Sequence, residues 1–159
     1  MNLKYTLMEK LNFKITITAP VEHVYTTMLG IQNKNTYKEW TAIFNPTSTY
    51  EGAWEKGSKI LFLGVDENGN KGGMVSKIDQ IIKNEFVSIL HYGILKNGAE
   101  VTNGEEVDKW TGGHENYTFT KLATGTELSV EIDAVDEFVS YFNETYPIAL
   151  EKLKEICER

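Results

Sequence analysis

The feature that most constrains the fold of this chain is a long succession of strand-forming segments, joined by polar turns and closed by one amphipathic helix. The segments are rich in β-branched and aromatic residues and alternate with turn-forming residues. They cover residues 49–54, 59–65, 73–82, 85–95, 114–121 and 126–134. Separators as short as Lys83-Asn84 indicate antiparallel neighbours, because a parallel crossover needs a dozen or more residues. We therefore predict one antiparallel sheet.

A further strand and two short helices precede this succession. In residues 11–18 every second side chain is apolar, which is the period of a strand with one buried face. Pro20 then predicts the first turn of a helix, where a missing N–H costs nothing, and Gly30 predicts its end. A second short helix is expected around residues 35–40. The polar stretch 96–112 is too long for a hairpin turn and is a candidate lid or functional loop.

The last segment predicts a long helix with one apolar face. Its apolar residues recur at spacings of three and four: Phe138, Tyr141, Phe142, Thr145, Ala149, Leu150, Leu153, Ile156 and Cys157. Asp136 is a suitable N-cap. Pro147 lies inside the pattern, so we expect it to kink the helix or divide it in two. Leu153 is predicted to be a core residue, and Cys157 a buried structural cysteine.

This order of elements predicts an α+β protein. A curved antiparallel sheet of about seven strands grips the C-terminal helix, with two short helices after the first strand. A chain of 159 residues without repeats or linkers is read as a single domain over residues 1–159. A curved sheet around a helix leaves a cleft unless bulky side chains fill it, and apolar clefts of this kind bind small molecules.

Four stretches carry a resemblance to a known superfamily. They are APVEHVY at 19–25, YGILKNG at 92–98, WTGGHENYTF at 110–119 and YPIALEKLK at 146–154. The first resembles the entry to the START-like or SRPBCC superfamily, which has the helix-grip fold. The other three are similar to its branch named after the homologues of the heat-shock-protein-90 ATPase activator. The resemblance extends from about residue 11 to residue 157 and is a pattern of spaced residues without a catalytic signature.

The resemblance implies a cavity between the sheet and the final helix that holds lipids, polyketides or other apolar molecules. Some members of the superfamily are cyclases or hydroxylase components, and many single-domain bacterial members have no assigned activity. The eukaryotic co-chaperone that gives the branch its name carries an additional domain. A chain of 159 residues leaves no room for that domain, which speaks against direct co-chaperone activity.

Composition excludes several classes of partner and site. The formal net charge is −7, and the acidic excess lies in residues 81–159, so a nucleic-acid partner is not expected. No apolar stretch approaches the roughly 20 residues of a membrane span. Residues 1–10 lack the apolar run of a signal peptide, and we expect a cytoplasmic protein. The single cysteine excludes an internal disulfide.

No motif assigns a metal, a cofactor or a catalytic group. His23, His91 and His114 have no second histidine or cysteine at metal-ligand spacing, so neither a metal site nor a cofactor is predicted. The serines lack the motif of a nucleophile elbow. Glu115 shares a strand face with Tyr117 and Phe119, so it reaches either the mouth of an apolar cavity or the solvent at the strand end.

Candidate ligand-binding residues follow from strand parity and from aromatic side chains near the ends of elements. On strand 73–82, Met74 and Ile78 share a face with the polar Ser76 and Gln80, a mixture that suits a cavity. Strand 85–95 is apolar on both faces, so it leaves open whether His91 or Tyr92 points inward. The predicted ligand-binding set is Trp40, Phe62, Met74, Ile78, His91, Trp110, Glu115, Tyr117, Phe119, Phe138, Tyr141 and Phe142.

The sequence favours a protein that binds an apolar or amphipathic small molecule in that cavity. One alternative is an enzyme of the cyclase or hydrolase type that uses Glu115 or His91 as acid–base. The other is a protein-interaction module like the chaperone activator, acting through the acidic second half. Whether the chain is an enzyme stays open, with binding favoured over catalysis. A protein partner also stays open, and the sequence identifies none.

Overall fold

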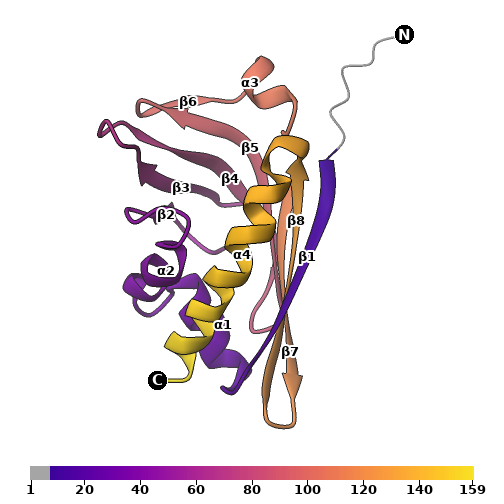
Figure 1. The fold of residues 1–159 in the computed structure, drawn as a ribbon. Coiled ribbons are helices and arrows are strands. Elements are labelled where there is room, and N and C mark those ends of the chain that lie inside the picture. The colour runs from indigo at the N-terminus through magenta and orange to yellow at the C-terminus, as the bar shows by residue number, and fades with distance from the viewer. Residues whose placement is uncertain (1–7) are drawn as a thin grey trace.

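One curved sheet wraps around a long C-terminal helix in this computed structural model, which describes residues 8–159 (Figure 1). The elements are, in chain order, β1 (Met8–Ile17), α1 (Val21–Leu29), α2 (Lys34–Thr41), β2 (Thr49–Gly52), β3 (Lys59–Val65), β4 (Lys71–Ile82), β5 (Phe86–Lys96), β6 (Ala99–Val101), α3 (Glu105–Asp108), β7 (His114–Leu122), β8 (Gly125–Val135) and α4 (Asp136–Cys157). The predicted α+β helix-grip architecture is confirmed.

The sheet is antiparallel throughout, and its strands follow the order β1-β8-β7-β5-β4-β3-β2. The first strand of the chain therefore pairs with the last one, and β1 lies at one edge of the sheet. β6 extends the predicted set of strands to eight by pairing with the end of β5. Residues 96–112 are thus not a plain loop: they form a hairpin, the short helix α3 and a return to β7.

The ends of two helices differ from the sequence-based expectation. Pro20 is the N-cap of α1 and lies just before its first turn, while Gly30 ends the helix in the left-handed conformation as predicted, with φ 67°. Asp136 lies in the first turn of α4, and the N-cap is Val135. A carboxylate in the first turn still stabilises the positive end of the helix dipole.

Pro147 does not divide the last helix, because α4 runs unbroken over its 22 residues. Pro147 itself is exposed, so the carbonyl that loses its helical donor lies on the side that water can reach. The predicted apolar stripe of α4 is wrong at one position before the proline. The prediction included Thr145, whose side chain is only half-buried, and omitted Tyr146, which is 1% exposed.

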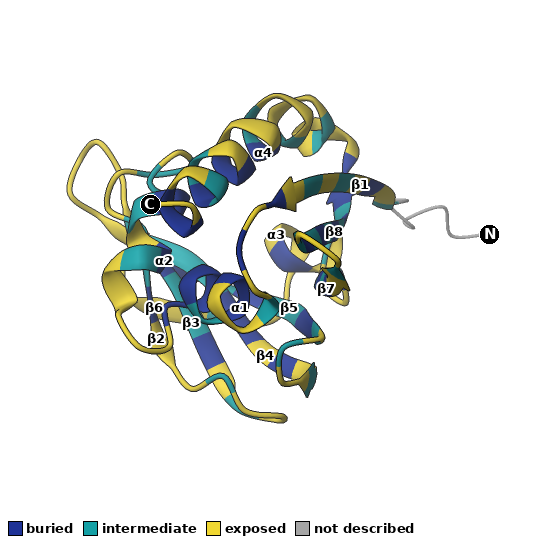
Figure 2. Cartoon of the chain, turned by 90° about the horizontal axis from the view of Figure 1, so that it is seen from below, coloured by how far each residue is buried: buried dark blue, intermediate teal, exposed yellow. Residues whose placement is uncertain are grey.

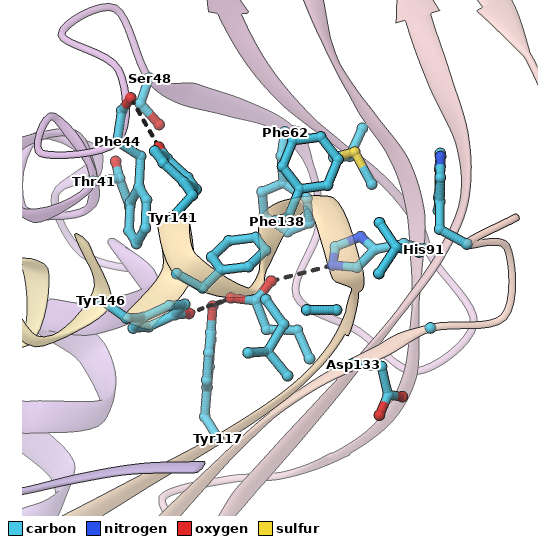
Figure 3. A pocket seen from close by; sticks show the side chains of 18 of the residues that line it. Thr41, Phe44, Ser48, Phe62, His91, Tyr117, Asp133, Phe138, Tyr141 and Tyr146 are labelled. Atoms are coloured by element: carbon cyan, nitrogen blue, oxygen red, sulfur yellow. Dashed lines mark hydrogen bonds and ion pairs between the residues drawn. The ribbon is translucent and has the colours of Figure 1, made fainter. Parts of the chain in front are cut away.

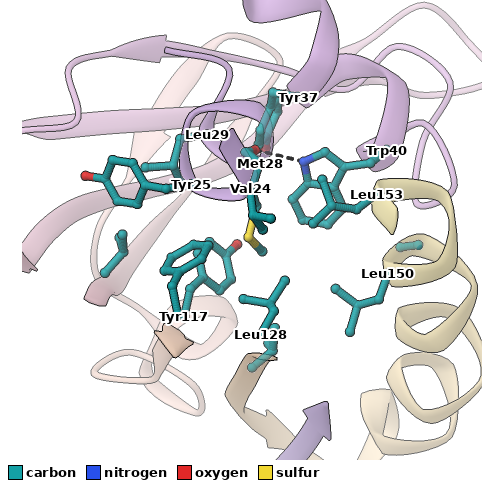
Figure 4. Packing of buried hydrophobic residues seen from close by; sticks show 14 of the residues in the cluster. Val24, Tyr25, Met28, Leu29, Tyr37, Trp40, Tyr117, Leu128, Leu150 and Leu153 are labelled. Atoms are coloured by element: carbon teal, nitrogen blue, oxygen red, sulfur yellow. Dashed lines mark hydrogen bonds between the residues drawn. The ribbon is translucent and has the colours of Figure 1, made fainter. Parts of the chain in front are cut away.

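The main core lies between the sheet and the helices. Figure 2 shows buried residues on the side of α4 that faces the sheet and on the facing strands. In Figure 4, Leu150 and Leu153 of α4 point toward Trp40 of α2 and Leu128 of β8. Leu153 is fully buried, as predicted. Cys157 is buried at the end of the same stripe, and burial raises the pKa of its thiol to about 12, which fits a structural cysteine.

A β-bulge in the pairing of β4 with β5 changes which side chains of β5 point inward beyond His91. Ser76 pairs with His91 and Val75 with Gly93, so Tyr92 has no partner of its own across the ladder. His91 lies on the concave face, next to Ser76, because it has the same parity as Val87 and Ile89, whose partners on β7 are Tyr117 and Glu115. Tyr92 packs on the other face, against the small cluster of Leu63, Val75 and Leu95.

Two sequence-based exclusions concern the described residues. Within residues 8–159, no helix is long and apolar enough to cross a membrane. The same residues contain no group of three or more His, Cys, Asp or Glu side chains placed to hold a metal ion. The reading of residues 1–10 as free of a signal peptide stays a prediction, since residues 1–7 lie outside the described part.

Candidate functional site

A cavity of about 440 Å³ lies between the concave face of the sheet and the first half of α4 (Figure 3). Small-molecule sites typically have volumes of roughly 300–1,000 Å³ and are mostly apolar. All of the predicted ligand-binding residues except Ile78 and Phe119 line this pocket. The sequence thus locates the cavity, and binding of a ligand by these residues stays a prediction.

Ile78 and Phe119 lie in the solid part of the core instead. Ile78 is fully buried, and Phe119 is buried to 4%. The ring of Phe119 packs edge-on against Tyr25 of α1, with 5.4 Å between the ring centroids. Strand parity is correct for Phe119, which shares the concave face with Glu115 and Tyr117. It lies farther along β7, where α1 covers the sheet.

Gln80 is also placed differently from the expectation. It is exposed, because a second irregularity between Ile78 and Gln80 breaks the alternation of β4. Ser76 does lie on the concave face, but it is fully buried and does not line the pocket. Of these two polar residues, only Ser76 belongs to the surroundings of the site.

Several lining residues were not predicted. They come from α2 and the loop after it, from β5, from the residue before β7, from the end of β8 and from α4: Tyr37, Thr41, Phe44, Ser48, Ile94, Gly113, Ile132, Asp133, Ala134, Val135 and Tyr146. The alternation of β8 contains a signal for Ile132 and Ala134, since both share the face of Leu128 and Val130. Tyr146 also had a signal, because it lies one helical turn beyond Phe142.

The rim of the pocket is aromatic. Phe138 and Tyr141 line the pocket from the first turns of α4, yet they are 47% and 42% exposed. Trp110, which follows α3, lines the same pocket and donates its indole N–H to the carbonyl of Glu106 at 2.9 Å. The beginning of α4 and the segment after α3 therefore frame the entrance, so residues 96–112 do contribute to the site.

The Glu115 carboxylate is the polar centre of the pocket. Its Oε1 lies 3.1 Å from Nε2 of His91, and its Oε2 accepts a hydrogen bond of 3.1 Å from the Tyr117 hydroxyl. The Tyr146 hydroxyl also donates to Oε2, which ties α4 to β7. Figure 3 shows the labelled His91, Tyr117 and Tyr146 side chains converging in the pocket. The Glu115 side chain is 16% exposed, so it is largely withdrawn from water.

His91 connects this carboxylate to β4. Its Nδ1 lies 2.6 Å from the hydroxyl of Ser76. A neutral ring with its proton on Nε2 satisfies every contact: Ser76 donates to Nδ1, and Nε2–H donates to Glu115. Both ring nitrogens of His91 are then engaged in hydrogen bonds within the protein. Three neighbouring strands, β4, β5 and β7, supply the three linked side chains.

The hydrogen bonds keep Glu115 ionised. Burial alone would raise the pKa of this carboxyl. The hydrogen bond from His91, the charge that His91 carries when protonated, and the hydrogen bonds from Tyr146 and Tyr117 outweigh burial, so the pKa lies below its ordinary value. Burial and the neighbouring Glu115 charge raise the pKa values of Tyr117 and Tyr146 well above the ordinary value. Both tyrosines therefore stay protonated as hydrogen-bond donors.

The other titratable side chains nearby have partners elsewhere or point away from the pocket. Asp133 lines the pocket, but it accepts a hydrogen bond of 2.9 Å from the backbone N–H of His114 and lies 3.4 Å from Nζ of Lys10. His114 points to the opposite face from Glu115, as adjacent strand residues must, and its Nε2 lies 3.1 Å from Asp79. His23 is exposed on α1, as expected.

This arrangement suits binding better than acid–base chemistry. A general base has to reach the proton that it removes, and it works best with a pKa near the operating pH. Neither nitrogen of His91 is free for this, and Glu115 has a lowered pKa. The linked Ser76, His91 and Glu115 have the residue types of a nucleophilic triad, but Ser76 does not reach the pocket.

Comparison with solved structures shows the same fold over nearly the whole chain. The Aha1 dimer from Colwellia psychrerythraea is 21% identical with a TM-score of 0.68, covering 95% of this chain and 97% of that one. The protein ChR145 from Cytophaga hutchinsonii is 18% identical with a TM-score of 0.68, covering 96% and 95%. The protein MLL2253 from Mesorhizobium loti is 14% identical with a TM-score of 0.67, covering 92% and 95%.

These likenesses confirm the predicted resemblance at the level of the fold. No protein-family model matches the chain, and no curated protein matches it. Because the identities are low, ligands and activities do not carry over from these structures. The function has to be argued from the pocket itself.

Proposed function

We propose that this protein binds an apolar or amphipathic small molecule in the pocket between the sheet and α4. The observation that supports this proposal is a 440 Å³ cavity with an aromatic lining and one buried carboxylate at its polar centre. A protein that needed only a stable core would close such a space, since interiors are packed to the density of organic crystals. The helix-grip fold is consistent with this role.

The distribution of polarity supports an amphipathic ligand. The apolar body would lie among the side chains of Phe44, Phe62 and Phe142. The polar end would face Glu115, a lining residue that is largely withdrawn from water and whose carboxylate accepts only three hydrogen bonds within the protein. Phe138 and Tyr141 at the rim would cover the bound molecule, in the way that aromatic residues at an entrance limit access of water.

The first test uses a neutral apolar fluorophore, N-phenylnaphthylamine, whose emission rises in an apolar site. We expect saturable binding to the folded protein with one site per chain. Mass spectrometry of small molecules retained after purification under native conditions gives an independent readout. Absence of probe binding together with absence of a retained molecule would refute the proposal.

Two variants of residues on α4 test whether the fluorescent probe binds in this pocket. Phe142→Ala removes a side chain that lines the pocket. It should weaken binding of the probe by about 1–3 kcal/mol, which is the free energy gained by burying one apolar side chain. Ile148→Ala is the matched control, since Ile148 lies on the same helix, is 57% exposed and does not line this pocket. Equal weakening by both variants would place the probe outside the pocket.

A further inference from the structure

The charges that line the pocket are of one sign. Among the described residues that line it, Glu115 and Asp133 are acidic, and none is a lysine or an arginine. Asp133 is already compensated by Lys10 and by a backbone N–H, whereas the partners of Glu115 are His91 and two neutral tyrosines. A ligand carboxylate would therefore meet a buried like charge and find no lysine or arginine in this lining to pair with.

Glu115 retains capacity for one more donor. An ionised carboxylate offers about four lone-pair sites. Oε2 accepts from both Tyr117 and Tyr146, while Oε1 has His91 as its single donor. One acceptor position on Oε1 is therefore free, on a side chain that lines the cavity and is 16% exposed. A hydrogen bond between this carboxylate and an N–H group of a ligand would be charge-assisted.

Aromatic rings pack against two of the partners of this carboxylate, His91 and Tyr146. The ring of Phe62 lies 6.2 Å from the His91 ring, centroid to centroid, and the ring of Tyr146 lies 5.1 Å from that of Phe44. Phe142 lies 6.3 Å from Tyr146 by the same measure. The faces of aromatic rings attract cations, and the attraction grows where water is excluded. Aromatic walls and an anionic base together favour a positively charged group.

We propose that the ligand is a cationic amphiphile, an apolar molecule with a protonated amine whose ammonium group pairs with Oε1 of Glu115. This inference rests on the proposed function, because it names the chemical class that the same pocket selects. It separates the pocket from those that hold fatty acids or other anionic amphiphiles, which need a lysine, an arginine or a comparable donor at the polar end.

The test compares three molecules that share one alkyl chain and differ in their head group: decylamine, decanol and decanoate. Each displaces N-phenylnaphthylamine from the wild-type protein at neutral pH, below its aggregation concentration. We expect decylamine to bind about 10- to 100-fold more tightly than decanol, because the hydroxyl of decanol can also donate to Glu115 but carries no charge, and decanoate to bind most weakly. Equal binding of decylamine and decanol, or stronger binding of decanoate, would overturn the proposal.

Two isosteric variants test the assignment to Glu115. Glu115→Gln removes the charge and keeps the shape, so decylamine should lose its advantage over decanol while the neutral probe still binds. Glu131→Gln is the control for net charge, because Glu131 lies on β8 next to Val130 and Ile132 and points to the outer face. Its decylamine preference should equal that of the wild type. Loss of the preference in Glu131→Gln, or its persistence in Glu115→Gln, would overturn the assignment.

The outcomes keep the two proposals apart. If the neutral probe fails to bind the wild type, the proposed function itself is wrong. If the probe binds but the head-group series shows no preference for the amine, the pocket binds apolar molecules and only the present inference is wrong. The comparison of decylamine, decanol and decanoate uses only the wild-type protein. It therefore tests the preference for an amine even if Glu115→Gln does not fold.

Discussion

Removing one hydroxyl group tests whether the Glu115 network holds α4 on the sheet. Tyr146→Phe deletes the donor to Oε2 of Glu115 and leaves the ring, which is buried to 1% and stacks on Phe13 with 5.1 Å between centroids. A hydrogen bond to a charged group contributes about 1.5–3 kcal/mol. Glu115 keeps its bonds from His91 and Tyr117 and is not left unpaired, so we expect a loss near 1.5 kcal/mol.

Urea unfolding at neutral pH measures this loss, and Tyr141→Phe is the matched control. Tyr141 lies on the same helix and is 42% exposed, and its hydroxyl reaches the carbonyl of Phe44 only at 3.4 Å. Its removal should cost less than about 0.5 kcal/mol. The difference between the two variants should shrink in acid, where Glu115 becomes protonated. Equal losses in both variants, or a difference that does not depend on pH, would refute the reasoning.

Three other predictions concern stability. Leu153 is fully buried, so Leu153→Ala should lower the free energy of unfolding by about 2–5 kcal/mol, and a loss under about 1 kcal/mol in urea would contradict its core position. Phe142 borders a cavity, so Phe142→Ala should cost less than the roughly 3–5 kcal/mol of a packed phenylalanine by calorimetry, and a loss in that range would indicate a solid core. The pKa of Glu115 is lowered from 4.5, so its contribution is complete above that pH and is lost as the pH falls through the folded-state pKa. Urea midpoints should therefore fall more steeply with acid in the wild type than in Glu115→Gln, and parallel profiles would contradict the lowered pKa.

Local patterns predicted the fold and about half of the residues that line the pocket. Strand alternation places Glu115 and Tyr117 on one face, and the structure puts both on the concave side. The spacing of apolar residues in the last helix locates Phe142 and Leu153 on the face toward the sheet. Each inference needs only the period of one element and the rule that an apolar face must be covered.

Part of the lining depends on an irregularity that these periods do not contain. His91 keeps the parity of Val87 and Ile89, but beyond it the register of β4 and β5 shifts by one residue, so that Ile94, of the opposite parity, also lines the pocket. Strand β5 is apolar on both parities around this shift, so no alternation marks it. Tyr146 lies one helical turn beyond Phe142, and the unbroken course of α4 past Pro147 is what keeps this spacing in the structure.

The same carboxylate serves both the fold and the proposed ligand. Glu115 accepts a hydrogen bond from Tyr146, so it fixes α4 against the sheet, and the same side chain lines the cavity that α4 covers. A ligand that occupies this position binds only the folded chain, because His91, Tyr117 and Tyr146 are brought together by folding. Binding must then raise the free energy of unfolding by mass action. It must also lower the pKa of Glu115 further if the bound group is a cation, and leave it nearly unchanged if the ligand is a neutral hydrocarbon.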